Sequence, residues 1–135
     1  MARQIFINLA VKDLQKTIEF YTKLGFTFDS QFTNEDGTCM IIEKDSIYAM
    51  LLTEKMFKTF TDKEICDTKK SVEVLNALQV ESKEVVNEMV VKAVAAGGKQ
   101  LKTQDHGWMY SIDFEDLDGH VWEPFWMDPK GPPKA

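Results

Sequence analysis

Glu123 has the setting that most favours chemistry in this sequence. It lies in the apolar segment Val121-Trp122-Glu123-Pro124-Phe125, where strand alternation places it on one face with Val121 and Phe125. A carboxylate flanked by apolar side chains is costly to bury unless it has a partner. In a dry cleft such a group suits acid or base catalysis near neutral pH. Glu123 is therefore a candidate catalytic residue; the alternative is a structural carboxylate that hydrogen-bonds a neighbouring Tyr or Asn.

The two histidines and Cys39 are the other candidate chemical groups. His106 lies in a glycine-containing loop before a strand, and loops at the mouth of a cleft often carry function. The alternative for His106 is a surface loop histidine. His120 has the strand parity of Trp122, which predicts that it lies on the face away from Glu123. Cys39 lies among apolar residues with no neighbouring positive charge to activate its thiol, so a nucleophilic role is not expected.

Polar and aromatic residues in other predicted strands could contact a ligand. Asn8 shares a strand face with Phe6, and Gln79 occupies the matching position in the second half of the chain. Each of these amides could hydrogen-bond a ligand across a cleft or a side chain of a neighbouring strand. Trp108 and Tyr110 could stack on a flat ligand, or they could belong to the core.

The elements that position these residues form a unit that occurs twice. In the first copy, residues 5–11 predict a strand, Asp13 caps a helix that ends at Gly25, and three strands follow. The pair Asp36-Gly37 predicts a hairpin turn with positive φ angles. This β-α-β-β-β order defines a first module over residues 4–53.

Residues 72–127 repeat this order as a second module. Val72 to Val80 predicts a strand, Ser82 opens a helix that ends at Gly97-Gly98, and a turn at Asp116-Leu117-Asp118-Gly119 precedes the last strand. The predicted fold class is α+β, with two βαβββ modules that form a U-shaped, half-barrel cleft. Because clefts are where small molecules bind, the repeat itself indicates a binding function.

Residues 54–71 form the connector between the modules and are expected to contain a short helix. The connector is rich in Lys, Glu, Asp and Thr, with scattered apolar side chains at Met56, Phe57, Phe60 and Ile65. It is either a solvated linker or a flap whose aromatic rings cover the cleft. Residues 128–135 contain prolines and predict a loose tail.

Composition restricts the partners and the location. The 135 residues carry a formal net charge of −6 without a basic run, so nucleic acids and anionic membranes are not expected as partners. No apolar stretch is long enough to span a membrane, and the N-terminus passes into a strand pattern without a signal peptide. Cys39 and Cys66 form neither a disulfide framework nor a zinc motif, so we expect free thiols in the cytoplasm. A monomer and a homodimer remain open alternatives.

Two motifs inside the repeat resemble the glyoxalase/bleomycin-resistance/dioxygenase superfamily, the vicinal oxygen chelate proteins. Residues 13–26, Asp-Leu-Gln-Lys-Thr-Ile-Glu-Phe-Tyr-Thr-Lys-Leu-Gly-Phe, resemble the first helix of that family. Residues 116–123, Asp-Leu-Asp-Gly-His-Val-Trp-Glu, resemble its closing hairpin, whose last strand bears a glutamate. The resemblance covers residues 4–127 and implies the duplicated fold.

Members of that family that resemble lactoylglutathione lyase or extradiol dioxygenases bind a divalent metal through four strand positions. In this sequence these positions fall on Phe6, near Met50, on Leu75 and on Glu123. Three of the four are apolar, and Glu123 alone is a ligand type that a divalent cation accepts. The resemblance therefore implies either no catalytic metal or a divalent metal that uses Glu123 with other ligands, such as His106 or His120.

Two functions follow from the resemblance. The first is binding of a small organic molecule in an apolar cleft without a metal or other cofactor, as in bleomycin-resistance proteins. The expected cleft residues are Phe6, Asn8, Met50, Leu75, Gln79, His106, Trp108, Tyr110 and Phe125. The second is a metal-dependent lyase or a dioxygenase that uses Glu123 as a base or a ligand. A further alternative is an interaction protein that kept the fold and lost the site.

Overall fold

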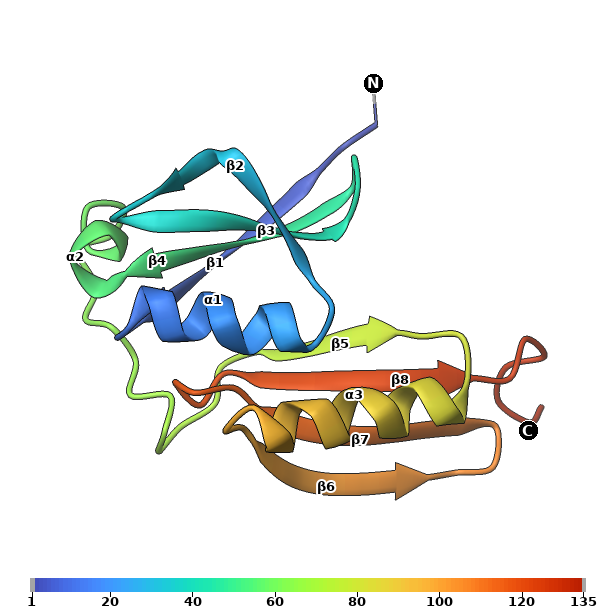
Figure 1. Ribbon diagram of the computed structural model, residues 1–135. Helices are drawn as coiled ribbons and strands as arrows, with labels where there is room; N and C mark the ends of the chain where they lie inside the picture. The colour runs from blue at the N-terminus through green and yellow to red at the C-terminus, as the bar shows by residue number, and fades with distance from the viewer. Residues whose placement is uncertain (1, 135) are drawn as a thin grey trace. The chain divides into compact units, whose positions relative to one another are not determined.

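The computed structural model describes residues 2–134, which divide into two compact units. The first unit extends to Asp67 and the second begins at Thr68. Each unit contains a strand, a helix and three further strands, in that order (Figure 1). The predicted α+β class and the repeated βαβββ order are therefore confirmed. No helix between residues 2 and 134 has the length and apolar character needed to cross a membrane.

The first unit is an open four-stranded sheet with one long helix. Its elements are β1 (Ile5–Val11), α1 (Leu14–Lys23), β2 (Thr27–Asn34), β3 (Gly37–Glu43), β4 (Ile47–Thr53) and the short α2 (Glu54–Phe57). The strand order is β1-β4-β3-β2, in which β1 and β4 are parallel and the other pairs are antiparallel. The last strand of the unit thus lies inside its sheet, beside the first.

Both ends of α1 follow from the sequence. The side chain of Asp13 accepts a hydrogen bond from the backbone N–H of Lys16 at 3.1 Å, which satisfies a donor that the first turn leaves unpaired. Gly25 has a φ of +99°, the left-handed conformation that ends a helix without steric cost. Between these ends, Phe20 and Tyr21 are fully buried and fix the helix to its sheet.

The turn at Glu35-Asp36 differs from the prediction. Neither Asp36 nor Gly37 has a positive φ, so the turn does not use the conformation that an Asp-Gly pair usually supplies. Gly37 is needed for space instead. A Cβ atom at Gly37 would lie 2.7 Å from Leu52 Cδ2 and 3.0 Å from the carbonyl oxygen of Leu51, both on the neighbouring strand β4. A close approach of two strands therefore selects glycine at this position.

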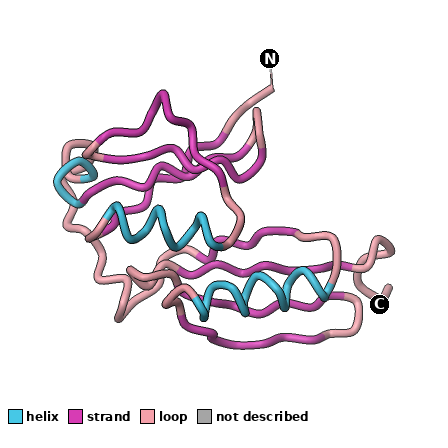
Figure 2. Tube along the Cα trace, viewed as in Figure 1, coloured by secondary structure: helices cyan, strands magenta, loops and turns pink. Residues whose placement is uncertain are grey.

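The second unit repeats the arrangement. Its elements are β5 (Leu75–Gln79), α3 (Lys83–Ala95), β6 (Lys99–Asp105), β7 (Met109–Glu115) and β8 (Val121–Met127). The strand order is β5-β8-β7-β6, with β5 and β8 parallel. Figure 2 shows α3 lying against this sheet, where Val86, Val90 and Ala93 are buried. Ser82 caps α3 by accepting a hydrogen bond from the N–H of Val85 at 3.2 Å, as the sequence predicts.

The turn between β7 and β8 is locked against the start of the second unit. Gly119 has a φ of +88°, and a Cβ atom there would overlap the backbone carbonyl of Thr68. The Thr68 hydroxyl donates a hydrogen bond to the carbonyl oxygen of Asp118. The Asp116 carboxylate accepts hydrogen bonds from the N–H groups of Asp118 and His120, each at 2.9 Å. This turn is therefore a rigid structural feature that sets where β8 begins.

Candidate functional site

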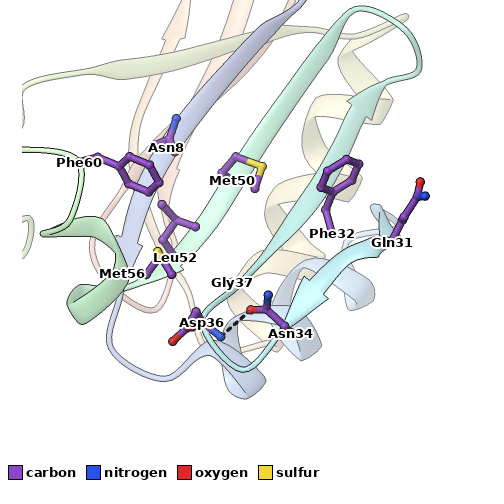
Figure 3. A pocket seen from close by; sticks show the side chains of 10 residues that line it. All are labelled: Asn8, Gln31, Phe32, Asn34, Asp36, Gly37, Met50, Leu52, Met56 and Phe60. Atoms are coloured by element: carbon purple, nitrogen blue, oxygen red, sulfur yellow. Dashed lines mark hydrogen bonds between the residues drawn. The ribbon is translucent and has the colours of Figure 1, made fainter.

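The first unit contains a cavity of about 250 Å³ on one side of its sheet (Figure 3). The residues that line it come from all four strands of the unit, from the β2–β3 turn, and from α2 with the segment that follows it. They are Asn8, Gln31, Phe32, Asn34, Asp36, Gly37, Met50, Leu52, Met56 and Phe60. All of these residues belong to one unit, so the cavity is a property of that unit alone.

The floor of the cavity is built by strand register. Asn8 pairs with Met50, and Leu52 pairs with Gly37, so these side chains project from one face of the sheet. The Asn8 amide donates a hydrogen bond to the carbonyl oxygen of Phe6 at 3.1 Å. An amide has two N–H donors and a carbonyl acceptor, so Asn8 keeps capacity for a ligand. The floor is therefore apolar with one amide group.

Two exposed aromatic rings and a methionine stand around this floor. Phe32 on β2 is 58% exposed, and Phe60, shortly after α2, is 71% exposed. The hydroxyl of Thr53 accepts a hydrogen bond from the N–H of Met56 at 3.2 Å and so caps α2. The N–H of Phe60 bonds the carbonyl oxygen of Phe57 at 3.0 Å, which continues the turn. The short helix and this turn hold Met56 and Phe60 at the edge of the cavity.

Asn34 and Asp36 form the polar end of the cavity. The backbone N–H of Asp36 donates to Asn34 Oδ1 at 2.8 Å, the bond drawn in Figure 3. This bond fixes the turn in which Asp36 lies. Within the described part of the chain, Asp36 is the one formally charged side chain that lines the cavity.

The second unit brings two carboxyl groups together on the sheet face opposite α3. Asp113 lies on β7 and Glu123 on β8, between the paired residues Ser111–Phe125 and Phe114–Trp122. The Asp113 and Glu123 side chains are joined by a hydrogen bond. Burial, this hydrogen bond and repulsion from Glu123 raise the pKa of Asp113 from 3.8 to about 7. The pair can therefore hold or release a proton near neutral pH.

Three predicted cleft residues lie near Glu123 on the same sheet face. Parallel pairing sets Ala77 beside Glu123, Leu75 beside Val121, and Gln79 beside Phe125. Residues two apart on a strand share a face, so Leu75, Gln79 and Phe125 surround the carboxyl pair. Leu75 is 55% exposed. The structure thus brings together four of the residues singled out in the second half of the sequence.

Other predicted residues of the second unit lie elsewhere. The Tyr110 hydroxyl donates to Asn87 Oδ1 on α3 at 2.6 Å, which places the ring on the helix side of the sheet, away from Glu123. Lys83 Nζ lies 5.8 Å from the Tyr110 ring centroid and 5.3 Å from that of Trp126. His106 is exposed in the β6–β7 loop, 3.1 Å from Gln104 Oε1. These contacts give Tyr110 a packing role.

Trp108 and His120 lie at the ends of strands. The carbonyl oxygen of Trp108 accepts a hydrogen bond from the N–H of Asp128 at 2.7 Å, which ties the β6–β7 loop to the end of β8. His120 lies in the turn before β8, and its carbonyl oxygen accepts from the N–H of Asp116 at 2.9 Å. Neither residue contributes to the cavity of the first unit.

Phe6 and Cys39 share the cavity side of the first sheet. The Phe6 ring stacks on Tyr48 with centroids 4.7 Å apart and planes 10° from parallel, beside the cavity rather than in its lining. Cys39 pairs with Met50 and is buried. Burial, with a smaller contribution from the Asp29 charge, raises the pKa of the Cys39 thiol, which disfavours the reactive thiolate.

Sequence reasoning missed Asp113 and Phe32. Asp113 lies in the middle of strand β7. Strand alternation places it on the same face as Ser111 and on the opposite face from the buried Ile112 and Phe114. This alternation was a signal that Asp113 could share a face with Glu123. Phe32 lies in a polar strand, β2, whose pairing with β3 is irregular between Asp29 and Asn34. That irregularity breaks the alternation, so no sequence pattern identifies the face that Phe32 occupies.

The four positions that correspond to the family's metal ligands do not suit a divalent metal. The structure places Phe6 and Met50 on the cavity side of the first sheet and Leu75 and Glu123 on the face opposite α3 in the second. Three of these side chains offer no oxygen or nitrogen donor, and Glu123 shares its hydrogen bond with Asp113. Among residues 2–134, no three His, Cys, Asp or Glu side chains converge as a metal site.

Comparison with known proteins gives one family. The family model described as Glyoxalase/Bleomycin resistance protein/Dioxygenase superfamily matches residues 3–123. A solved structure of the hypothetical protein SA1046 from S. aureus is 26% identical, covers 93% of this chain and 94% of its own, and has a TM-score of 0.77. No curated protein matches the sequence.

Two further structures share the fold at lower identity. A glyoxalase-related enzyme from Fulvimarina pelagi is 20% identical, covers 100% of this chain and 94% of its own, and has a TM-score of 0.79. The fosfomycin resistance protein FosX from Listeria monocytogenes is 19% identical, covers 96% of this chain and 97% of its own, and has a TM-score of 0.67. A FosX mutant was solved with Mn(II) and 1S,2S-dihydroxypropylphosphonic acid.

Proposed function

This chain belongs to the Glyoxalase/Bleomycin resistance protein/Dioxygenase superfamily, and we propose that it binds a small, largely apolar organic molecule in the cavity of its first unit. The observation that carries the proposal is the lining of that cavity, which combines five apolar side chains with the polar side chains of Asn8, Gln31, Asn34 and Asp36. Small-molecule sites in proteins have this composition, because apolar contact supplies affinity and a few polar groups fix orientation.

Exposed rings at the cavity supply a driving force for binding. Phe32 and Phe60 are both more than half exposed, although aromatic side chains are usually covered. Covering roughly 50 Å² of each ring would contribute about 2–3 kcal/mol at ~25 cal/mol per Å². Met50 and Met56 add thioether side chains that adapt their shape to a ligand. A ligand that fills the space between these side chains therefore gains binding free energy from the apolar surface that it buries.

The binding is proposed to need no catalytic metal. The residues at the family's ligand positions, Phe6, Met50, Leu75 and Glu123, include a single donor. A catalytic metal site generally supplies three protein ligands and an open position. Sequestration of an organic molecule requires none.

Methionine methyl NMR tests the binding proposal directly. The chain has seven methionines, of which Met50 and Met56 line the cavity, whereas Met89, Met109 and Met127 lie in the second unit. With [13C-methyl]methionine labelling, a ligand from a library of small organic molecules should shift the Met50 and Met56 signals and leave the others in place. If no compound moves these two signals at millimolar concentration, the proposal fails.

Acid–base catalysis at Glu123 is a second candidate function. It is favoured by one observation, the hydrogen bond between Glu123 and Asp113. The pKa of Asp113 is raised to about 7, so a group that exchanges a proton near neutral pH lies beside Glu123. A group that exchanges its proton near the working pH is suited to general acid–base catalysis. The substrates to assay are those suggested by the family name, a thiohemiacetal of a 2-oxoaldehyde and a catechol.

The variant Glu123→Gln distinguishes catalysis from binding alone. If Glu123 moves a proton in a turnover step, kcat should fall about 10²-fold or more in this variant. Binding to the cavity of the first unit, followed by the Met50 and Met56 methyl signals, should not change. Equal turnover by wild type and variant would eliminate this second function and leave the first intact.

A further inference from the structure

The charge of the cavity lining selects among organic ligands. Asp36 is the one formally charged side chain among the described residues that line it, and no Lys or Arg does so. The whole chain adds to this sign, with a formal net charge of −6. An anionic ligand would thus meet a carboxylate and find no cation to pair with. A cationic ligand would meet a counter-ion at the polar end.

The apolar side chains of the cavity also suit a cation. The faces of aromatic rings attract ammonium groups, and Phe32 and Phe60 both stand at the cavity with more than half of their surface exposed. The carbonyl oxygens of the Asn8 and Asn34 amides are further acceptors for an N–H donor. Figure 3 shows Asp36 and Asn34 at one end of the cavity lining, with Asn8 and Phe60 toward the other end.

We propose that the occupant of this cavity is an organic cation, an amine or quaternary ammonium group attached to an apolar body. The cationic group lies toward Asp36, and the apolar body lies on Met50 and Leu52. This inference depends on the proposed function, because it names the class of molecule that the same cavity takes. The proposed preference for a cation predicts that phosphonates and other anions bind this cavity weakly.

Three matched probes test the charge preference. They are 2-phenylethylamine, which is a cation at pH 7, the neutral 2-phenylethanol, and the anionic 3-phenylpropanoate. Their phenylethyl groups are identical, so the terminal group alone differs. Titrations followed by the Met50 and Met56 methyl signals should give an amine Kd about tenfold below that of the alcohol. The propanoate should bind most weakly.

Two variants assign the preference to Asp36. In Asp36→Asn the amine should lose about half of its free-energy advantage, so that its Kd is about threefold below that of the alcohol. Glu35→Gln is the matched control, because it removes the same charge from the neighbouring turn position, which does not line the cavity. This control should keep the full tenfold difference.

The outcomes separate the two proposals. If the alcohol or the propanoate shifts Met50 and Met56 at a Kd equal to or below that of the amine, the organic-cation inference is overturned while the binding site stands. If Asp36→Asn keeps the tenfold difference, the placement of the cationic group is likewise overturned. If none of the probes and no library compound moves the two signals, the binding site itself is lost, and this inference with it.

Discussion

Asp113 and Glu123 are joined by a hydrogen bond between their carboxyl groups across strands β7 and β8. Two ionised carboxylates contain only acceptors, so this bond requires one proton shared by the pair. Glu123 is the residue singled out by the resemblance of the closing hairpin, and the hydrogen bond from Asp113 restrains the orientation of its side chain. The raised pKa of Asp113 means that this side chain loses its proton near pH 7.

The stability of the second unit should fall as the pH rises from about 4 to about 7. The pKa of Asp113 is raised to about 7 in the folded protein, whereas the unfolded chain loses this proton near pH 4. Folding therefore takes up a proton in this interval, and its contribution is complete below pH 4 and lost above pH 7. Solvent screening of the half-exposed pair limits the effect to about 1 kcal/mol. Urea unfolding at several pH values, followed by tryptophan fluorescence, measures it.

The variant Asp113→Asn should remove this pH dependence. Asparagine still donates a hydrogen bond to Glu123 but cannot be charged. The free energy of unfolding of the variant should therefore exceed that of wild type by about 1 kcal/mol at pH 8. All three tryptophans, Trp108, Trp122 and Trp126, lie in the second unit, so their fluorescence reports on it. Asp105→Asn, at the exposed last residue of β6, is the control. An unchanged slope in Asp113→Asn would contradict the shared proton.

Gly119→Ala should destabilise the second unit far more than Gly107→Ala. Both glycines have positive φ angles, +88° and +80°, so both substitutions cost about 1 kcal/mol of backbone strain. A Cβ at Gly119 would also overlap the backbone of Thr68, whereas nothing lies within 4 Å at Gly107. We expect a total loss of about 3 kcal/mol or more for Gly119→Ala. Equal urea midpoints for the two variants would disprove the close contact.

Phe60→Ala should weaken ligand binding without changing stability. The ring is 71% exposed, so its removal should alter the free energy of unfolding by less than about 0.5 kcal/mol. The affinity for a phenylethyl probe should fall about five- to tenfold, because one wall of the cavity is lost. Val94→Ala, an exposed position on α3, is the control and should change neither quantity. A Phe60→Ala variant that binds the probe normally would exclude the ring from the site.

Purified protein should take up no stoichiometric Mn²⁺, Ni²⁺ or Zn²⁺. Glu123 is the one donor at the four family ligand positions, and a lone carboxylate competes poorly with water for a divalent ion. Equilibrium dialysis followed by elemental analysis measures the uptake, with Glu123→Gln as the comparison. Tight uptake of one equivalent that is lost in Glu123→Gln would overturn the metal-free proposal.

The fold could be predicted from the sequence because its signals are local. Asp13, Gly25 and Ser82 act at helix ends through hydrogen bonds and φ angles that involve their own neighbours in the chain. The family resemblance is likewise carried by two continuous segments. Strand alternation correctly separates Glu123 from the α3 side of the sheet.

The sites could not be predicted to the same degree because they depend on tertiary contacts. Tyr110 is directed to α3 by its bond to Asn87, a residue 23 positions away. Glycine is required at position 37 because Leu52 lies too close for a side chain, and not because the predicted turn needs a positive φ angle. Phe60 lies in a connector with no regular pattern, so only the structure shows that it lines the cavity.

The strand order has a consequence for synthesis on the ribosome. In each unit the last strand to be made, β4 or β8, occupies an interior place in its sheet, between the first strand and the third. Until that strand emerges, β1 or β5 has no neighbour with which to form a ladder. A nascent chain that stalls before Ile47 or before Val121 would therefore expose β1 or β5 as an unpaired strand that chaperones can bind. Each sheet is completed only when its last strand inserts between the first strand and the third.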